Sequence, residues 1–293
     1  MLRRTFVGSS LVLGCASTSR GSKAPARRSW AERRAEFRTR LRALGPAPGE
    51  WKPQATPEGA REVRLPGATG ELLAWYAAPP GAVKVPALVY FHGEFSLARW
   101  DFNQVRPFLA AGFAVLTPSL RGENGNPGAF ELLMGEVDDA VAAVRWIAGR
   151  PEVDASRIYT LGHSVGGGVS GLLSLVPDVP VAVTGSVGGV YSVRTFGKWA
   201  SDPGTAPLVR FDPTNRDETE LRVLGANLAD MVRPHRAYVG VEDLGILDNA
   251  RAVRGAATAS AAPFTLTEIA GDHAKSLQPG IRAFLEDVTR RTG

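Results

Sequence analysis

Cysteine is almost absent from this 293-residue sequence, which contains Cys15 and no other. A single cysteine excludes an intrachain disulfide and any metal site built from several cysteines. The apolar run near the N terminus, residues 6–13, is too short to span a bilayer. With 44% hydrophobic and 22% charged residues, the composition is that of a globular protein, and the length suits one large α/β domain with a leader.

The main part of the chain also lacks excess positive charge. Residues 1–50 contain 11 Lys/Arg and 3 Asp/Glu, a net charge of +8, whereas the whole chain carries +5, which leaves −3 for the remainder. Proteins that bind nucleic acid present a cationic surface to the phosphates. The sequence therefore predicts no nucleic-acid partner.

The positive charge at the start belongs to a pattern typical of export signals. Arg3 and Arg4 precede the short apolar run, as in twin-arginine signals, and residues 12–15 (VLGC) resemble a lipoprotein cleavage site. We expect residues 1–28 to be an export signal and tether, and Cys15 to carry a lipid anchor, with an unmodified cysteine as the alternative. The expected location is the bacterial cell envelope, periplasmic or lipid-anchored.

A helix and linker are predicted over residues 29–60. Ser29 and Glu32 have the spacing of a capping box, and the run stops at Gly45. Four apolar residues fall on one helical face: Trp30, Phe37, Leu41 and Leu44. We expect this face to pack against the main domain.

Residues 61–293 alternate short β-rich runs with longer helical segments, which favours βα units and a mostly parallel eight-stranded sheet flanked by helices. Strands are predicted at 61–65, 71–76, 86–91, 113–117, 157–161, 181–186, 236–240 and 264–269. Helices are predicted at 102–111, 131–149, 166–175, 248–260 and 278–291. Residues 188–234 have weak periodicity, so we expect an excursion over the sheet edge.

A Gly-x-Ser-x-Gly pattern at residues 162–166 (GHSVG) marks the candidate nucleophile. The strand predicted at 157–161 precedes it and a helix follows, as in the nucleophile elbow, a strand-to-helix turn too tight for side chains at the glycines. A structural glycine-rich turn is the alternative. The context favours Ser164 as the nucleophile.

A serine hydroxyl needs a base to take its proton, and the sequence has only four histidines. In the fold that carries this elbow the order is Ser, acid, His, which leaves His235 and His273. His273 lies in a polar loop after the last predicted strand and is favoured, because His235 begins a strand. Asp243 follows the penultimate strand and is the predicted acid, with Glu242 and Asp248 as alternatives.

The tetrahedral oxyanion needs backbone donors. The turn at residues 91–95 (FHGEF), after the third predicted strand, is expected to supply the Glu94 N–H, with that of Phe95 next, and Val165 N–H is the second donor. His92 is expected to hold this turn. A carboxylate at Glu94 would oppose the oxyanion unless it points away.

Six stretches, in this order, resemble the α/β-hydrolase superfamily and its prolyl-oligopeptidase-like and dienelactone-hydrolase-like branch. They are residues 90–93 (YFHG), 112–116 (GFAVL), 120–122 (LRG), 136–140 (EVDDA), 153–158 (VDASRI) and 162–167 (GHSVGG). The resemblance implies a loop at Arg121 and Gly122 near the active-site rim, and Asp138 or Asp139 as a brace for the helix before the elbow.

The predicted activity is serine hydrolysis of an ester or other small acyl substrate through an acyl-enzyme, with no metal or organic cofactor. The expected partner is a small-molecule ester or amide. Esters are favoured because only about sixty residues precede the domain, where oligopeptidases of this branch carry a β-propeller. An exported aminoacyl-peptide hydrolase is the near alternative, and a non-catalytic envelope-anchored binding protein is the third.

Overall fold

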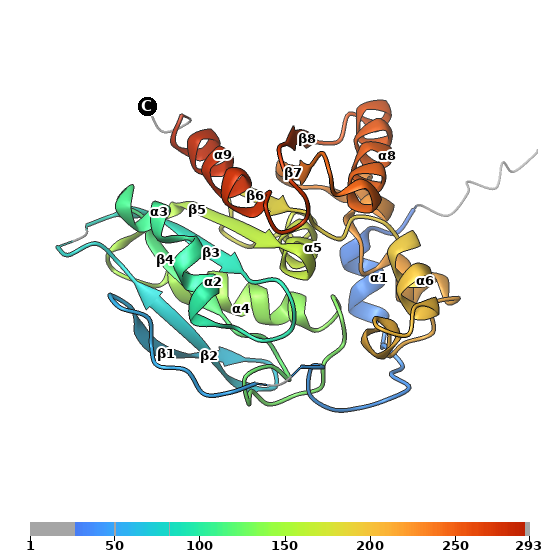
Figure 1. The fold of residues 1–293 in the computed structure, drawn as a ribbon, viewed down its shortest axis with the longest axis horizontal. Coiled ribbons are helices and arrows are strands. Elements are labelled where there is room, and N and C mark those ends of the chain that lie inside the picture. The colour runs from blue at the N-terminus through green and yellow to red at the C-terminus, as the bar shows by residue number, and fades with distance from the viewer. Residues whose placement is uncertain (1–26, 50, 82, 291–293) are drawn as a thin grey trace, which may run out of the picture.

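An eight-stranded sheet forms the centre of the protein (Figure 1). The computed structural model describes residues 27–49, 51–81 and 83–290. The strands are β1 (Arg61–Gly67), β2 (Gly70–Ala77), β3 (Val85–Phe91), β4 (Ala114–Pro118), β5 (Val153–His163), β6 (Val183–Val187), β7 (His235–Gly240) and β8 (Phe264–Ile269). Their order across the sheet is β1-β2-β4-β3-β5-β6-β7-β8.

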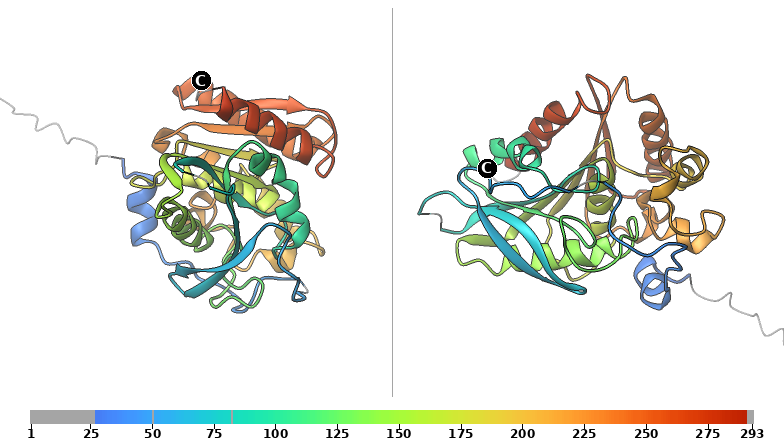
Figure 2. Two further views of the ribbon diagram at one scale, coloured as in Figure 1. Left: turned by 90° about the vertical axis from the view of Figure 1, so that its left-hand side faces the viewer. Right: turned by 60° about the horizontal axis from the view of Figure 1, so that its bottom comes forward.

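The sheet is antiparallel at one edge and parallel elsewhere. β1 and β2 form a hairpin, β2 runs antiparallel to β4, and all pairs from β4 to β8 are parallel. The sheet fans out with a strong twist between the hairpin and β8, as Figure 2 shows. The predicted class, a mostly parallel eight-stranded α/β-hydrolase sheet, is confirmed.

Helices cover both faces of the sheet. They are α1 (Trp30–Glu36), α2 (Arg99–Gln104), α3 (Arg106–Ala110), α4 (Glu136–Ala148), α5 (Ser164–Leu173), α6 (Arg194–Ser201), α7 (Arg216–Glu220), α8 (Leu244–Ser260) and α9 (Leu277–Thr289), with short 3₁₀ turns at Ala206–Leu208, Leu224–Ala226 and Leu228–Asp230. One apolar core joins α4, α5 and α8 to one face, and the other joins α2, α3 and α9 to the opposite face. Successive residues of β3 pack alternately into the two cores, and the strand is therefore apolar throughout.

The helix predicted over 131–149 begins five residues late, at Glu136. The Glu136 carboxylate accepts hydrogen bonds from the backbone N–H groups of Glu131 (2.7 Å) and Leu132 (3.1 Å), which holds the preceding loop in a non-helical path. Leu132 has a φ of 53°, outside the helical region. Buried capping by a carboxylate therefore overrides the apolar periodicity there.

The helix predicted from residue 29 toward Gly45 was correct only in its first turns. Ser29 forms the expected capping box with Glu32, but α1 ends at Glu36 because Phe37 is extended. After Glu36 the backbone is held by a contact with a distant segment, since the Arg40 N–H donates a hydrogen bond to the Glu218 carboxylate at 2.8 Å. Leu44, assigned to the packed face, is 80% exposed, and that assignment was wrong.

The predicted excursion forms a cap, residues 188–234, between β6 and β7, and an N-terminal strap, residues 27–49, holds it. The Trp30 indole is 2% exposed and donates to the Leu221 carbonyl at 3.0 Å. The ion pairs Arg27–Asp230, Arg33–Glu220 and Arg42–Asp212 join strap and cap. The Glu218 carboxylate of the cap also accepts hydrogen bonds from the Thr39 hydroxyl and the Arg40 N–H of the strap. The cap is thus fastened by segments far apart in the sequence.

The same strap is also fixed to the body of the domain. Arg34 pairs with Asp138 of α4 at 2.8 Å, and the Ala47 N–H donates to the Gly122 carbonyl at 2.8 Å. The strap therefore bridges cap and body. The export and lipid-anchor predictions at Cys15 lie outside the described residues.

Candidate active site

Ser164 lies at the sharp turn between β5 and α5. β5 ends at His163 and α5 begins at Ser164. The backbone φ of Ser164 is 51°, a value that residues other than glycine rarely adopt. Since β5 pairs with β3 and β6, the turn emerges at the carboxyl edge near the middle of the sheet. Strain at such a position is typical of a residue held out toward a ligand.

Two glycines make this turn possible. A Cβ atom at Gly162 would lie 2.0 Å from the Gly166 carbonyl oxygen, and one at Gly166 would lie 2.2 Å from the His92 carbonyl oxygen. Both distances are far below van der Waals contact, and the obstructing atoms are backbone. The pattern found in the sequence is therefore a steric requirement of the elbow.

Asp243 and His273 meet beside the elbow. The His273 Nδ1 lies 2.6 Å from the Asp243 Oδ2. A carboxylate can only accept here, so this hydrogen bond places the proton on Nδ1 and leaves Nε2 free to receive one. The Asp243 side chain is 12% exposed and that of His273 41%, which puts the acid behind the imidazole.

The alternative residues for the acid and the base do not form this contact in the structure. Glu242 and Asp248 are exposed, and the carboxylate that contacts His273 is that of Asp243. His235 is fully buried and hydrogen-bonds Ser186 at 2.8 Å, and burial lowers its pKa to about 3. It is a neutral core residue.

His163, to which the sequence assigned no role, packs against His273. The ring centroids are 4.9 Å apart, and the His163 Nε2 lies 3.2 Å from the His273 carbonyl oxygen, to which it donates. Burial, assisted by the neighbouring His273, lowers the pKa of His163 to about 4, so it is neutral at pH 7. The only sequence signal was its place inside the Gly-x-Ser-x-Gly pattern.

His92 fixes the turn that carries the predicted oxyanion donor. Its Nδ1 donates to the Gly93 carbonyl at 2.8 Å, and its Nε2 contacts Glu123 at 3.1 Å. Burial disfavours the imidazolium, but Glu123 outweighs this and raises the pKa of His92 to about 9, so both ring nitrogens donate. Because a peptide's C=O and N–H point in opposite directions, holding the Gly93 carbonyl also sets the direction of the Glu94 N–H.

A pocket of about 590 Å³ surrounds Ser164 and His273. Glu94 and Val165, the two predicted oxyanion donors, line it, so the structure brings these four predicted residues together. The cap adds a wall of three residues: Trp199, Thr205 and Leu208. Nothing in the weak periodicity of residues 188–234 indicated this contribution.

Arg121, which the family resemblance placed in a loop near the active-site rim, is held in a buried salt bridge. Neither it nor Gly122 is among the residues that line the pocket around Ser164. Its guanidinium is 7% exposed and forms a two-pronged ion pair with Asp139, at 2.9 Å for each contact. The expected brace at Asp139 and the Arg121 loop are thus the two halves of one buried salt bridge.

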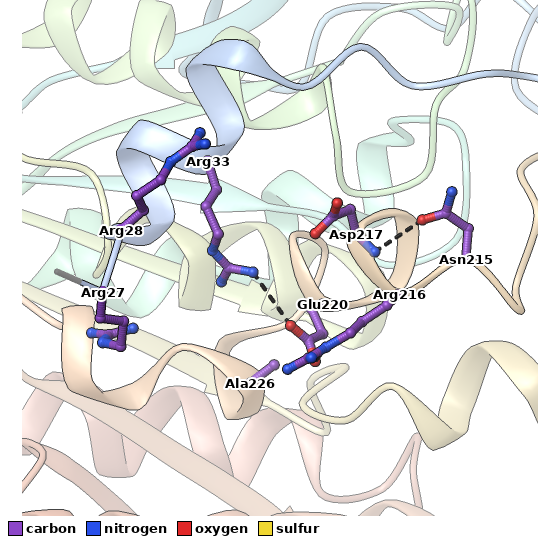
Figure 3. A pocket seen from close by; sticks show the side chains of 8 residues that line it. All are labelled: Arg27, Arg28, Arg33, Asn215, Arg216, Asp217, Glu220 and Ala226. Atoms are coloured by element: carbon purple, nitrogen blue, oxygen red, sulfur yellow. Dashed lines mark hydrogen bonds and ion pairs between the residues drawn. The ribbon is translucent and has the colours of Figure 1, made fainter. Parts of the chain in front are cut away.

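A second hollow, of about 640 Å³, lies between α1 and α7, away from Ser164. Figure 3 shows that arginines surround it, with Arg33 directed at Glu220. Arg216 pairs with the same carboxylate at 2.6 Å, and Arg27 pairs with Asp230. Since each of its four arginines is ion-paired and no serine, cysteine or histidine lines it, the chemistry belongs to the pocket at Ser164.

The described ranges contain no group of three or more His, Cys, Asp or Glu side chains arranged to hold a metal ion. Within those ranges, no helix has the length and apolar character needed to cross a membrane. Independence from metals and organic cofactors stays a prediction.

The sheet topology shows the α/β-hydrolase fold, as predicted, and the elbow and the His–Asp pair are those of a serine hydrolase site. The chain belongs to the X-Pro dipeptidyl-peptidase (S15 family), whose family model matches residues 25–197. This match includes the elbow and the oxyanion turn and ends before Asp243 and His273. A search of curated proteins found no match.

Solved structures share the fold at low sequence identity. A Mycobacterium tuberculosis puromycin-hydrolyzing peptidase is 19% identical (TM-score 0.68), and an acylaminoacyl peptidase of Pyrococcus horikoshii is 18% identical (TM-score 0.64). These matches cover 79% and 78% of this chain but only 39% and 40% of the peptidases. A Pyrobaculum calidifontis esterase is 16% identical (TM-score 0.62), with 80% of this chain and 84% of the esterase covered.

Proposed function

We propose that the protein hydrolyses small esters through an acyl-enzyme. The Ser164 Oγ attacks the ester carbonyl carbon while the His273 Nε2 takes its proton, and the oxyanion accepts hydrogen bonds from the Glu94 and Val165 N–H groups. His273 then protonates the leaving alcohol. Water, activated by the same imidazole, releases the acid and restores Ser164. Asp243 holds the imidazole in the tautomer that each step needs.

The observation that carries this proposal is the 2.6 Å hydrogen bond between His273 and Asp243 beside a strained Ser164. The three groups come from different connections at the carboxyl edge of the sheet, after β5, β7 and β8. Nucleophile and base line one pocket. A histidine oriented by a carboxylate, in one pocket with a serine, supports serine acyl transfer.

Ester substrates are supported by the structural likeness to the Pyrobaculum calidifontis esterase, 84% of which is covered by the match. A pocket of about 590 Å³ also suits a small acyl compound. Hydrolysis of aminoacyl peptides is the second candidate, and the family match supports it.

A fluorophosphonate probe is expected to label the protein on the peptide that contains Ser164, since the probe reacts with an activated serine. Paired assays should show faster turnover of short p-nitrophenyl esters than of aminoacyl amides. The Ser164→Ala variant is the control and should lose both labelling and turnover. Folded wild-type protein that stays unlabelled would contradict the proposal, and faster turnover of the amides would favour the peptidase.

We also propose that the protein is exported and anchored to the bacterial envelope through a lipid on Cys15. The support is the sequence pattern of Arg3, Arg4, the apolar run at 6–13 and the cysteine that follows it. A single lipid chain binds membranes only weakly, so a stable anchor would need more than one chain or an added basic segment. Arg20 and Lys23, between Cys15 and the strap, would add positive charge beside the lipid.

Cys15→Ser is expected to move the full-length protein from the membrane fraction to the soluble fraction, because the serine cannot accept the thioether-linked lipid. Immunoblotting of fractionated cells would measure the shift. Ser17→Ala, two residues away, is the matched control and should leave the protein with the membranes. Equal fractionation of wild type and Cys15→Ser would remove the anchor proposal.

A further inference from the structure

The wall of the Ser164 pocket combines a carboxylate with aromatic rings. Glu94 and Phe95 come from the loop after β3, Trp100 comes from the start of α2, and Trp199 comes from α6 in the cap. No lysine or arginine is among the residues that line this pocket. The pocket lining is therefore largely apolar and aromatic, and it contains two carboxylate residues, Glu94 and Asp101, with no lysine or arginine.

Glu94 supplies that charge without a partner. Across the described ranges, no lysine, arginine or histidine nitrogen lies within the 4.0 Å ion-pair distance of its carboxylate. The second carboxylate of the wall, Asp101, is 5% exposed and accepts from the Ala98 N–H at 2.8 Å. Burial raises the pKa of Asp101. The free negative charge that a ligand would meet is that of Glu94.

The aromatic residues have properties that suit a cation. Trp100 is 55% exposed although it is large and apolar, which leaves much of its surface open. Trp199 packs edge-on against Phe196, with ring centroids 6.4 Å apart, and this contact holds it in the cap. Indole faces attract ammonium groups, and the attraction grows where water is excluded.

We infer that this wall, formed by Glu94, Trp100 and Trp199, binds a cationic group of the substrate, an ammonium or quaternary ammonium. The inference rests on the proposed function, because the group would be carried by the ester that Ser164 attacks. Glu94 is exposed, so its carboxylate is accessible to a ligand. A neutral ester gains nothing from an unpaired carboxylate at this place, whereas a positively charged group is attracted to it.

The position of Glu94 links this selection to the chemistry. Its backbone N–H is the proposed oxyanion donor, whereas its carboxylate, if left unpaired, opposes the negative charge that develops there. A cation bound to the carboxylate removes that opposition. A cationic substrate therefore gains in binding and also loses an electrostatic penalty during attack.

Choline and 3,3-dimethylbutan-1-ol provide a matched pair of probes, since they have the same shape and differ in the charge of the head group. Titration calorimetry on the full chain is expected to give a dissociation constant about tenfold lower for choline. Binding does not require turnover, so the measurement stands apart from fluorophosphonate labelling of Ser164. Equal affinities in an enzyme that is labelled would overturn this inference and leave the proposed function intact.

Two variants assign the preference to this wall. Glu94→Gln and Trp100→Leu should each reduce the preference for choline to about threefold or less. Glu71→Gln removes another exposed carboxylate, at the start of β2 and outside the pocket, and should keep the tenfold preference. A preference that persists in Glu94→Gln, or that falls equally in Glu71→Gln, would overturn the inference.

Discussion

Asp243→Asn is expected to lower kcat for ester hydrolysis by about 10⁴-fold, with a much smaller change in KM. The side-chain amide can donate a hydrogen bond to the Nδ1 of His273, where the carboxylate accepts one at 2.6 Å. This donation would favour the tautomer with its proton on Nε2, which cannot take the Ser164 proton. Steady-state kinetics with a p-nitrophenyl ester would measure the loss.

Two neighbouring carboxylates serve as matched controls for Asp243. Glu242 and Asp248 are both exposed, and Glu242 is adjacent to Asp243 in the sequence. Glu242→Gln and Asp248→Asn should keep kcat within about threefold of wild type, since exposed charges contribute little through solvent. A loss of 10⁴-fold in either control, with Asp243→Asn active, would assign the acid differently.

Gly166→Ala is expected to lower the free energy of unfolding by about 3 kcal/mol and kcat by about 100-fold. The added methyl group would lie 2.2 Å from the His92 carbonyl oxygen and 2.3 Å from that of Phe91. These atoms belong to the end of β3 and the turn that follows it, so relief of the clash displaces the oxyanion donor. Thermal unfolding and steady-state kinetics would report the two effects.

Gly255→Ala gives the opposite expectation from the same chemical change. A Cβ atom at Gly255, in α8, meets no atom within 4 Å. Alanine in a helix interior should therefore stabilise the protein by about 0.5–1 kcal/mol and leave kcat unchanged. Similar destabilisation by both substitutions would show that the loss in Gly166→Ala is not caused by the elbow.

The sequence predicted the parts of the fold that local patterns determine. The apolar run of β3 indicated a strand buried on both faces, and the structure places its alternate residues in two cores. The Gly-x-Ser-x-Gly pattern worked for a related reason, since Gly162 and Gly166 each face a backbone atom at close range. In both places short-range sterics and burial decide the conformation.

Prediction failed where distant groups decide the conformation. α4 begins later than predicted because the Glu136 carboxylate accepts hydrogen bonds from the loop before it. α1 ends earlier than predicted, and the Arg40 N–H beyond it donates to the Glu218 carboxylate instead of to a helical carbonyl. The pocket wall from the cap depends on how residues 188–234 are held over the sheet, and periodicity carries no information on that. The partner of Arg121 was likewise hidden, because Asp139 is eighteen residues away.

The bridge made by residues 27–49 has a consequence for how the enzyme should be produced. A shortened protein starting at Arg61 would keep every strand of the sheet and the Ser164, Asp243 and His273 side chains. It would nevertheless leave the cap without the Trp30 indole. The Glu218 carboxylate would keep its contact with Arg222 but lose the hydrogen bond from the Thr39 hydroxyl of the strap. An N-terminal truncation for recombinant production therefore belongs before Arg27, and a purification tag is better placed after α9.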